Sequence, residues 1–173
     1  MPGPLSGFRI VDLTQMISGP MATMILADQG ADVIKVEPPS AGDLTRVLAG
    51  RRHTVSPTFA VANRNKRSVV IDLKQARGIQ LLKRLVMQAD LFVQNFRPGT
   101  ADRMGFGYGV LHEVKPDLIY VSISGFGEAG PYVHKRTYDP VIQALSGLAS
   151  IQADPASGRP RMLRVIVPDK VPR

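Results

Sequence analysis

The chain has 173 residues, of which 44% are hydrophobic and 21% are charged, and it contains no cysteine. These values are typical of one globular domain, and they exclude wholesale disorder, disulfide scaffolds, thiolate nucleophiles and zinc–thiolate sites. The net charge of +8 favours an anionic partner, which is a nucleic acid, an acidic membrane surface or a phosphorylated small molecule.

The basic residues do not form the pattern expected of a nucleic-acid-binding surface. They are scattered, and the aromatic residues on which bases stack make up only 6% of the chain. No apolar segment approaches the roughly 20 residues that cross a bilayer. The first residues also lack the charged and apolar regions of a signal peptide. We therefore expect a cytoplasmic protein with no nucleic-acid or membrane partner.

The first part of the chain predicts a strand–helix–strand unit. Residues 8–13 form an apolar strand, and Gly19-Pro20 opens a helix over 21–29, which ends at Gly30. A second strand over 32–37 stops at two prolines. The unit takes about 30 residues, which is the size of a βαβ crossover.

The next part begins with an irregular stretch. Residues 38–66 are rich in Pro, Gly, Ser and paired Arg, so we expect a functional loop or short helices. Regular patterns resume with a strand over 67–73, a helix over 75–89 and a strand over 90–96. Apolar residues recur at helical spacing in the predicted helix, which therefore buries one face.

The last part predicts four more elements: a short helix over 108–114, a strand over 117–124, a helix over 138–150 and a strand over 162–167. The alternation of strands and helices predicts an α/β fold, with a parallel sheet covered by helices on both faces. A parallel sheet is usually covered by a helix after each strand. Because none follows residue 167, we expect either an incomplete domain or an edge strand at 162–167.

One glycine-rich segment has two interpretations. Residues 125–130 spell G-x-G-x-x-G directly after a predicted strand, which is the fingerprint of dinucleotide-binding proteins. However, Pro131 follows, no helical pattern begins before about Tyr138, and the expected acidic residue about 20 positions later is missing. A glycine-rich loop at the end of a strand is the other interpretation, and such loops often line ligand sites.

Carboxylates are the remaining candidates for chemistry. The sequence has no P-loop, no H-E-x-x-H and no G-x-S-x-G motif, and its three histidines do not have metal-ligand spacing. Asp12, Asp139 and Asp169 lie in or beside apolar segments, where a carboxylate needs either a partner or a catalytic task. Each is a candidate nucleophile or acid–base group, or else a helix cap or an ion-paired residue.

Several blocks of this sequence occur together, and in this order, in one known family. They are Gly7–Thr14, Gly19-Pro20, Gly30–Glu37, Gly42-Asp43, Asn63–Ser68, Asp72–Lys74, Asn95–Gly99 and Arg103–Gly105. Over essentially its whole length the chain resembles the class III coenzyme A transferases. This group includes formyl-CoA:oxalate and carnitine CoA-transferases and the 2-methylacyl-CoA racemases.

The resemblance implies a fold and an assembly. Family members are more than twice as long, with a Rossmann-like large domain, a smaller second domain and an interlocked homodimer. Residues 1–173 would then be the N-terminal part of the large domain, without the small domain and the C-terminal return. Acyl-CoA and a carboxylic acid would be the substrates. No metal and no permanently bound cofactor is implied.

The resemblance also implies a mechanism. In the family an aspartate attacks the acyl-CoA thioester, and an anhydride and an aspartyl–CoA thioester follow before CoA passes to an acceptor carboxylate. That aspartate aligns with Asp169. The CoA contacts align with Gln15, Met16, Ile17, Ser18, Lys74, Asn95, Phe96, Arg103, Met104, Arg136 and Asp139.

Two alternatives stay open beside the transferase. The racemase branch of the family has a His-Asp pair where this chain has Tyr138-Asp139, and racemisation needs an acid and a base on opposite faces of the α-carbon. The other alternative is a truncated, non-catalytic CoA-binding fragment.

Overall fold

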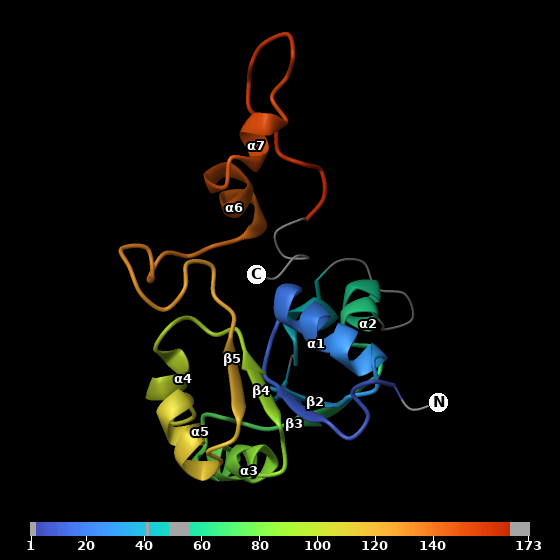
Figure 1. Cartoon of the computed structure of the whole chain (residues 1–173), viewed down its shortest axis with the longest axis vertical. Coiled ribbons are helices and arrows are strands. Elements are labelled where there is room, and N and C mark those ends of the chain that lie inside the picture. The colour runs from blue at the N-terminus through green and yellow to red at the C-terminus, as the bar shows by residue number, and fades with distance from the viewer. Residues whose placement is uncertain (1–2, 41, 49–55, 167–173) are drawn as a thin grey trace.

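A computed structural model describes residues 3–40, 42–48 and 56–166 of the chain. Its centre is a sheet of five parallel strands in the order β3-β2-β1-β4-β5 (Figure 1). The strands are β1 (Arg9–Asp12), β2 (Asp32–Glu37), β3 (Lys66–Val70), β4 (Leu91–Gln94) and β5 (Ile119–Ser122). The predicted α/β fold with a parallel, Rossmann-like sheet is confirmed.

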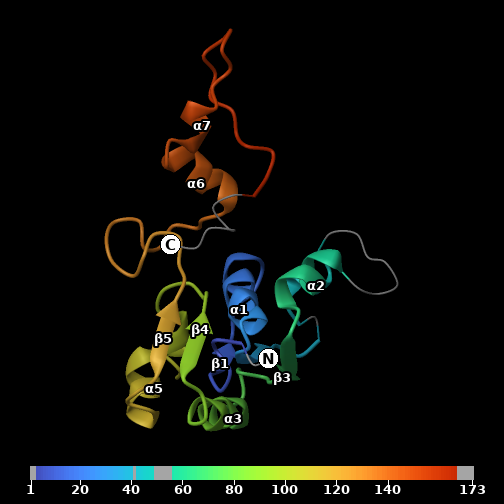
Figure 2. The ribbon, with the colours of Figure 1, turned by 45° about the vertical axis from the view of Figure 1, so that its right-hand side comes forward.

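Helices cover both faces of this sheet, as predicted (Figures 1 and 2). One face carries α1 (Ser18–Asp28), beside which α2 (Pro57–Asn63) lies, and the other carries α3 (Ala76–Val86) and α5 (Tyr108–Val114). Shorter helices are η1 (Leu44–Arg46), α4 (Thr100–Arg103), α6 (Asp139–Leu145) and α7 (Leu148–Ile151). No described helix is long and apolar enough to cross a membrane.

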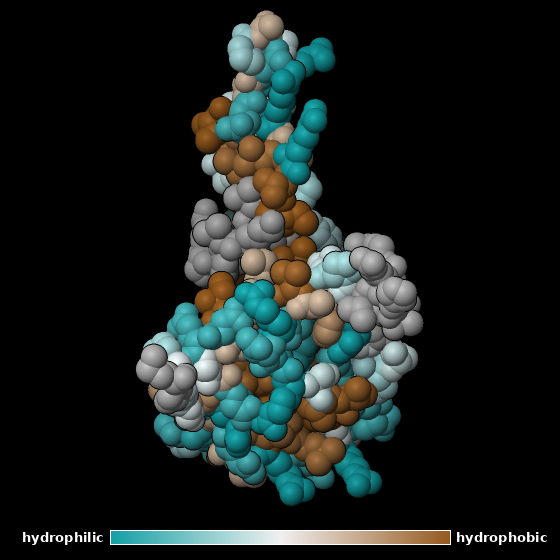
Figure 3. All heavy atoms as spheres, turned by 90° about the vertical axis from the view of Figure 1, so that its right-hand side faces the viewer, coloured by the Kyte–Doolittle hydropathy of each residue, from teal (hydrophilic) through white to brown (hydrophobic). Residues whose placement is uncertain are grey.

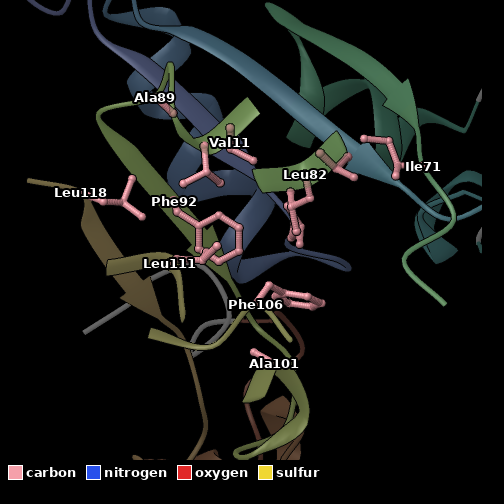
Figure 4. Packing of buried hydrophobic residues seen from close by; sticks show 12 residues of the cluster. Val11, Ile71, Leu82, Ala89, Phe92, Ala101, Phe106, Leu111 and Leu118 are labelled. Carbon is pink, nitrogen blue, oxygen red and sulfur yellow. The ribbon is translucent and has the colours of Figure 1, made fainter. Parts of the chain in front are cut away.

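The core divides between the two faces because successive strand residues point to opposite sides. Val11 and Phe92 pack with Leu82 of α3 and Leu111 of α5 in the larger cluster (Figure 4). Their neighbours on the same strands, including Ile10, pack toward α1 in a second cluster. The central strands β1 and β4 are thus buried on both faces, which holds their carboxyl ends in fixed positions.

The stretch over 38–66 contains short helices, as one of its two interpretations predicted. Asp43 caps η1 by accepting a hydrogen bond from Thr45 N at 2.9 Å. Ser56 caps α2, with Pro57 in the first turn, where its missing N–H costs nothing. By contrast, α4 follows a short loop after β4 and was not predicted, because four residues are too few to show helical periodicity.

Beyond β5 the chain leaves the sheet and forms an arm, defined here as residues 125–166, which projects from the carboxyl edge (Figures 1 and 2). The helix predicted over 138–150 is divided there into α6 and α7. Gly147 separates them with a φ of 81°, a left-handed conformation that glycine adopts without strain.

The strand predicted over 162–167 is wrong for residues 162–166, and residue 167 lies outside the described residues. The segment is apolar enough for a strand, but it runs along the arm, where it pairs with no strand of the sheet. Two of its polar backbone atoms bond to Gln143 of α6 instead. Leu163 N donates to Gln143 Oε1 at 2.8 Å, and Val165 O accepts from Gln143 Nε2 at 3.3 Å.

Candidate functional site

The carboxyl edge of the sheet is where the candidate site residues gather. All five strands are parallel, so their carboxyl ends share one edge. From β1 the chain builds the sheet outward through β2 and β3, and then returns to the other side of β1 to add β4 and β5. Ligands of open α/β sheets bind at the point where the strand order reverses, which here lies between β1 and β4.

Gln15 and Asn95 meet at this point. Asn95 Oδ1 accepts a hydrogen bond from Gln15 N at 2.9 Å, and Asn95 Nδ2 donates to Gln15 O at 2.8 Å. The side-chain amide of Asn95 is therefore committed to the loop after β1. Asn95 and Gln15 are both predicted CoA contacts, and the side chain of Asn95 holds the backbone of Gln15 in place.

The loop after β1 also has an unusual backbone conformation. Met16 has a φ of 69°, in the left-handed region that non-glycine residues rarely occupy. Its N–H donates to Asp43 Oδ1 at 3.3 Å. Ile17 follows, and Ser18 is the first residue of α1. The four residues Gln15–Ser18, which were predicted together, form one structured turn between β1 and α1.

A hollow of about 390 Å³ lies between this turn and the arm. Met16 and Ile17 form its wall on the side of the sheet, and Asp139 is part of the wall on the side of the arm. Three of the predicted residues are therefore brought together around one hollow. The remaining lining residues are Tyr138, Pro140, Gln143, Met162, Leu163, Arg164, Val165 and Ile166.

Asp139 is the acidic group of this hollow, and it is buried, with 7% of its surface exposed. Its Oδ2 accepts a hydrogen bond from Gln143 Nε2 at 2.5 Å, whereas its Oδ1 has no partner among the described residues. Gln143 also holds the opposite wall, because it bonds to Leu163 N at 2.8 Å and to Val165 O at 3.3 Å. Sequence reasoning missed Gln143, which occupies an ordinary position one helical turn after Asp139.

Asp12, a candidate for chemistry, is instead an ion-paired structural residue. Its Oδ1 accepts from Thr14 N at 2.8 Å and from Thr14 Oγ1 at 2.5 Å. Its Oδ2 accepts from Thr23 Oγ1 at 2.7 Å and from Lys66 Nζ at 3.0 Å. Burial lowers the pKa of Lys66, and the negative charge of Asp12 offsets part of this effect. Asp12 is not among the residues that line the hollow.

A second buried ionic group lies under the same loop. Lys35 is 1% exposed, and its Nζ lies 2.9 Å from Asp43 Oδ2, an ion pair without hydrogen-bond geometry. Burial raises the pKa of Glu37, but hydrogen bonds from Arg46, Ser68 and the Asp43 N–H outweigh this effect and lower it to about 2. A lysine between the apolar residues Ile34 and Val36 of β2 was the signal in the sequence that could have revealed this group.

The other predicted contacts do not line the hollow. Lys74, Arg103 and Arg136 are exposed, and they follow three different strands of the sheet. Phe96 and Met104 pack against the larger core cluster. The ring of Phe96 lies 5.8 Å from that of Phe106. Asp169 lies outside the described residues, so its role stays a prediction.

The glycine-rich segment over 125–130 is a loop at the start of the arm. The structure has only turns and bends between β5 and α6, so no helix begins at this segment. The dinucleotide interpretation, which requires an opening helix, is therefore wrong, and the loop interpretation is confirmed.

Known proteins resemble this chain over nearly its whole length. The family model described as "CoA-transferase family III" matches residues 5–172. Succinyl-CoA:glutarate CoA-transferase of Mus musculus is 45% identical over 158 residues, which are 91% of this chain and 36% of that protein. Formyl-CoA:oxalate CoA-transferase of Escherichia coli is 44% identical over 151 residues, which are 87% of this chain and 36% of that protein.

A solved structure has the same fold. A CAIB/BAIF family protein from Brucella suis superposes with a TM-score of 0.92 at 36% identity. The superposition covers 98% of this chain and 46% of that one. The chain thus spans between about a third and a half of the length of the proteins that it matches.

Proposed function

The chain belongs to CoA-transferase family III, and from this premise we propose that it binds coenzyme A at the carboxyl edge of its sheet and serves in CoA transfer from an acyl-CoA to a carboxylate. The observation that carries the proposal is the position of the turn Gln15–Ser18. This turn lies at the switch point of the sheet and forms one wall of the hollow. Relatives named for CoA transfer to oxalate or glutarate support the reaction class.

The charge of the chain suits a phosphorylated ligand. The net charge is +8, and exposed Lys74 and Arg103 follow β3 and β4 on the carboxyl side of the sheet. Arginine and lysine bind phosphate by charge-assisted hydrogen bonds. In the proposed complex these residues hold the phosphates of CoA, while the acyl end reaches the hollow. Coenzyme A is here a substrate, not a permanently bound cofactor.

The chemical step that we propose uses a carboxylate nucleophile, with Asp169 as its assignment from the family resemblance. A carboxylate oxygen attacks the thioester carbonyl, the C–S bond breaks, and a mixed anhydride and the CoA thiolate form. The thiolate then attacks the aspartyl carbonyl, which releases the donor acid and leaves an aspartyl–CoA thioester. The acceptor carboxylate attacks that thioester, and the released thiolate attacks the acceptor carbonyl of the new anhydride. This regenerates the aspartate and forms the new acyl-CoA.

Asp139 is the competing nucleophile, because it is buried and its Oδ1 has no partner among the described residues. Hydroxylamine attacks the aspartyl carbonyl of the anhydride or the thioester, releases the carboxylate or the CoA thiolate, and leaves a hydroxamate that mass spectrometry locates. After incubation with an acyl-CoA we expect the hydroxamate on Asp169, and we expect its loss in Asp169→Asn. A hydroxamate on Asp139 would reassign the nucleophile.

Binding and transfer are tested separately. Isothermal titration with CoA measures binding, and chromatography of acyl-CoA products from succinyl-CoA with glutarate, or formyl-CoA with oxalate, measures transfer. Binding with transfer is the expected result for the transferase. Binding without transfer would indicate a CoA-binding fragment without catalytic activity. This is the alternative to the transferase, and it is favoured because the chain matches only 36% of each of the two relatives. The absence of binding at millimolar CoA would contradict both.

We further infer that the protein works as a homodimer. The inference is supported by the arm, on which hydrophobic surface is exposed (Figure 3). The exposed large apolar side chains of the arm include Tyr138, Leu145, Ile151 and Met162. Single exposed apolar residues are ordinary, but a contiguous group marks an interaction surface.

A further inference from the structure

We propose that the buried Lys35–Asp43 ion pair is a positioning device for the loop after β1, and that it sets the geometry of Thr14–Met16 for substrate binding. The proposal rests on the proposed function for the identity of the ligand. Neither residue touches the hollow. Their role is to hold the backbone of the loop that carries Met16, which does line it.

Lys35 reaches the loop from the middle of β2. It is 1% exposed and lies opposite Asp12 of β1 in the register of the sheet. Its Nζ donates to Thr14 O at 2.7 Å and lies 2.9 Å from Asp43 Oδ2. The ammonium group thus connects the carbonyl of Thr14 to the carboxylate of Asp43.

Asp43 holds the loop from the other side of the pair. It is fully buried, and its Oδ1 accepts from Met16 N at 3.3 Å and from Thr45 N at 2.9 Å. Its own N–H donates to Glu37 Oε2 at 2.8 Å, so Asp43 is itself fixed to the end of β2. The carboxylate that accepts the hydrogen bond from Met16 N is therefore held in place. This bond restrains Met16 in its uncommon conformation, with a φ of 69°.

Three consecutive residues of the loop are held by side chains from three different parts of the chain. Lys35 holds the carbonyl of Thr14, Asn95 holds both polar backbone atoms of Gln15, and Asp43 holds the N–H of Met16. A buried ion pair often contributes little net stability compared with apolar side chains of the same size. The arrangement is therefore better explained by the conformation that it fixes than by the stability that it supplies.

The test separates positioning from stability with three variants. Lys35→Met removes the bond to Thr14 O and leaves the Asp43 carboxylate buried without its cation, so it lowers the melting temperature. In Lys35→Met/Asp43→Asn no unpaired charge remains, so most of the stability returns, while Thr14 still lacks its donor. Arg46→Met is the matched control, because it breaks the neighbouring ion pair with Glu37 and leaves every contact to the loop in place.

Two readouts are taken on the folded chain. Hydrogen exchange, measured without any ligand, should be at least about 10-fold faster at Gln15 and Met16 in both Lys35 variants and unchanged there in Arg46→Met. The dissociation constant for CoA should rise at least about 10-fold in the double variant although its melting temperature is near that of the wild type.

The proposal is overturned if the double variant recovers both stability and wild-type exchange at Gln15 and Met16, since the pair would then serve stability alone. It is also overturned if the double variant does not fold, because the pair would then be required by the sheet itself. If the wild-type chain binds no CoA, the proposed function fails, and the exchange measurement still decides whether the pair positions the loop.

Discussion

Buried charged side chains on and beside β1, β2 and β3 occur as matched pairs. Lys66 pairs with Asp12, Lys35 with Asp43, and the half-exposed Arg46 with Glu37. An isolated buried charge is costly, and pairing together with hydrogen bonds removes most of that cost. The pairs join β1, β2, β3 and the loop at 42–46, so the positions of the loops at the carboxyl edge depend on them.

Glu37 predicts an acid-sensitive stability. Its pKa is about 2 in the folded chain and near 4.5 when unfolded, so the folded state favours the ionised form. This contribution, on the order of 3 kcal/mol, is fully present above about pH 5 and is lost as the pH falls toward 2. Urea unfolding of Glu37→Gln should therefore give a lower stability at pH 7 and a shallower loss between pH 5 and 2.

The matched control is Glu113→Gln, which removes the same charge from the exposed side of α5. It should keep the wild-type dependence on pH. If Glu37→Gln also kept that dependence, the carboxylate of Glu37 would not be responsible for it.

Arg103 is the residue with which the phosphate contact can be tested. It is exposed in α4, and its only described side-chain hydrogen bond is to Thr100 Oγ1 at 3.1 Å. A charge-assisted contact with phosphate contributes about 1.5–3 kcal/mol, so Arg103→Ala should weaken CoA binding by roughly 10- to 100-fold at low salt. Arg84→Ala, at the opposite end of the sheet in the last turn of α3, changes the net charge equally and should bind as the wild type does. Equal affinity of the two variants would remove Arg103 from the site.

Among the elements, α3 depends on one glycine for its position against the sheet. A Cβ at Gly78 would lie 1.9 Å from the carbonyl oxygen of Asp72, so only glycine permits this approach. In most exposed helical positions the change from glycine to alanine stabilises a protein by about 0.5–1 kcal/mol. At Gly78 the backbone must shift instead, and we expect Gly78→Ala to destabilise the chain by about 1–3 kcal/mol.

The comparison position is Gly109 of α5, where an added Cβ meets no atom within 4 Å. Gly109→Ala should therefore raise the melting temperature, and Gly78→Ala should lower it. Shifts of the same sign in thermal unfolding would show that the contact with Asp72 does not decide the effect.

The sequence predicts those elements whose pattern is strong and local. The strands at β1 and β2 and the helix α3 follow from apolar periodicity alone, close to their observed bounds. The segment at 162–166 is apolar without being a strand, because a strand also requires a neighbour to pair with. Gly147 divides the predicted helix. The helix was predicted from the pattern of hydrophobic residues, and this pattern does not show that Gly147 takes a left-handed conformation.

The candidate site is predictable only in part for a related reason. The family resemblance implies CoA contacts at Gln15–Ser18 and Asp139, and the structure brings Met16, Ile17 and Asp139 to one hollow. The bonds between Asn95 and Gln15 join residues 80 positions apart, so they depend on the strand order. The residues next to Asn95 in the sequence do not show whether its side chain contacts a ligand or instead holds Gln15 in place.

At the scale of the whole molecule, a compact sheet carries a projecting arm with exposed apolar side chains. Leu145 is 61% and Ile151 is 76% exposed. We expect the chain to associate at micromolar concentrations, with Leu145→Lys/Ile151→Lys shifting it toward monomer in sedimentation velocity. Val70→Lys, on the edge strand β3 at the far side of the sheet, changes an equally exposed apolar residue and should leave association unchanged. A wild-type chain that sediments as a single monomeric species would contradict this expectation.

We propose that the turn after β1 and the hollow beside it form the binding site for coenzyme A. The most direct measurement is a titration of the ¹⁵N-labelled chain with CoA, followed by the amide resonances. Saturable shifts are expected at Gln15–Ser18 and around Asp139, with small changes at the amino edge near Lys83 and Arg84. Shifts confined to scattered exposed basic residues, or no shifts at millimolar CoA, would contradict it.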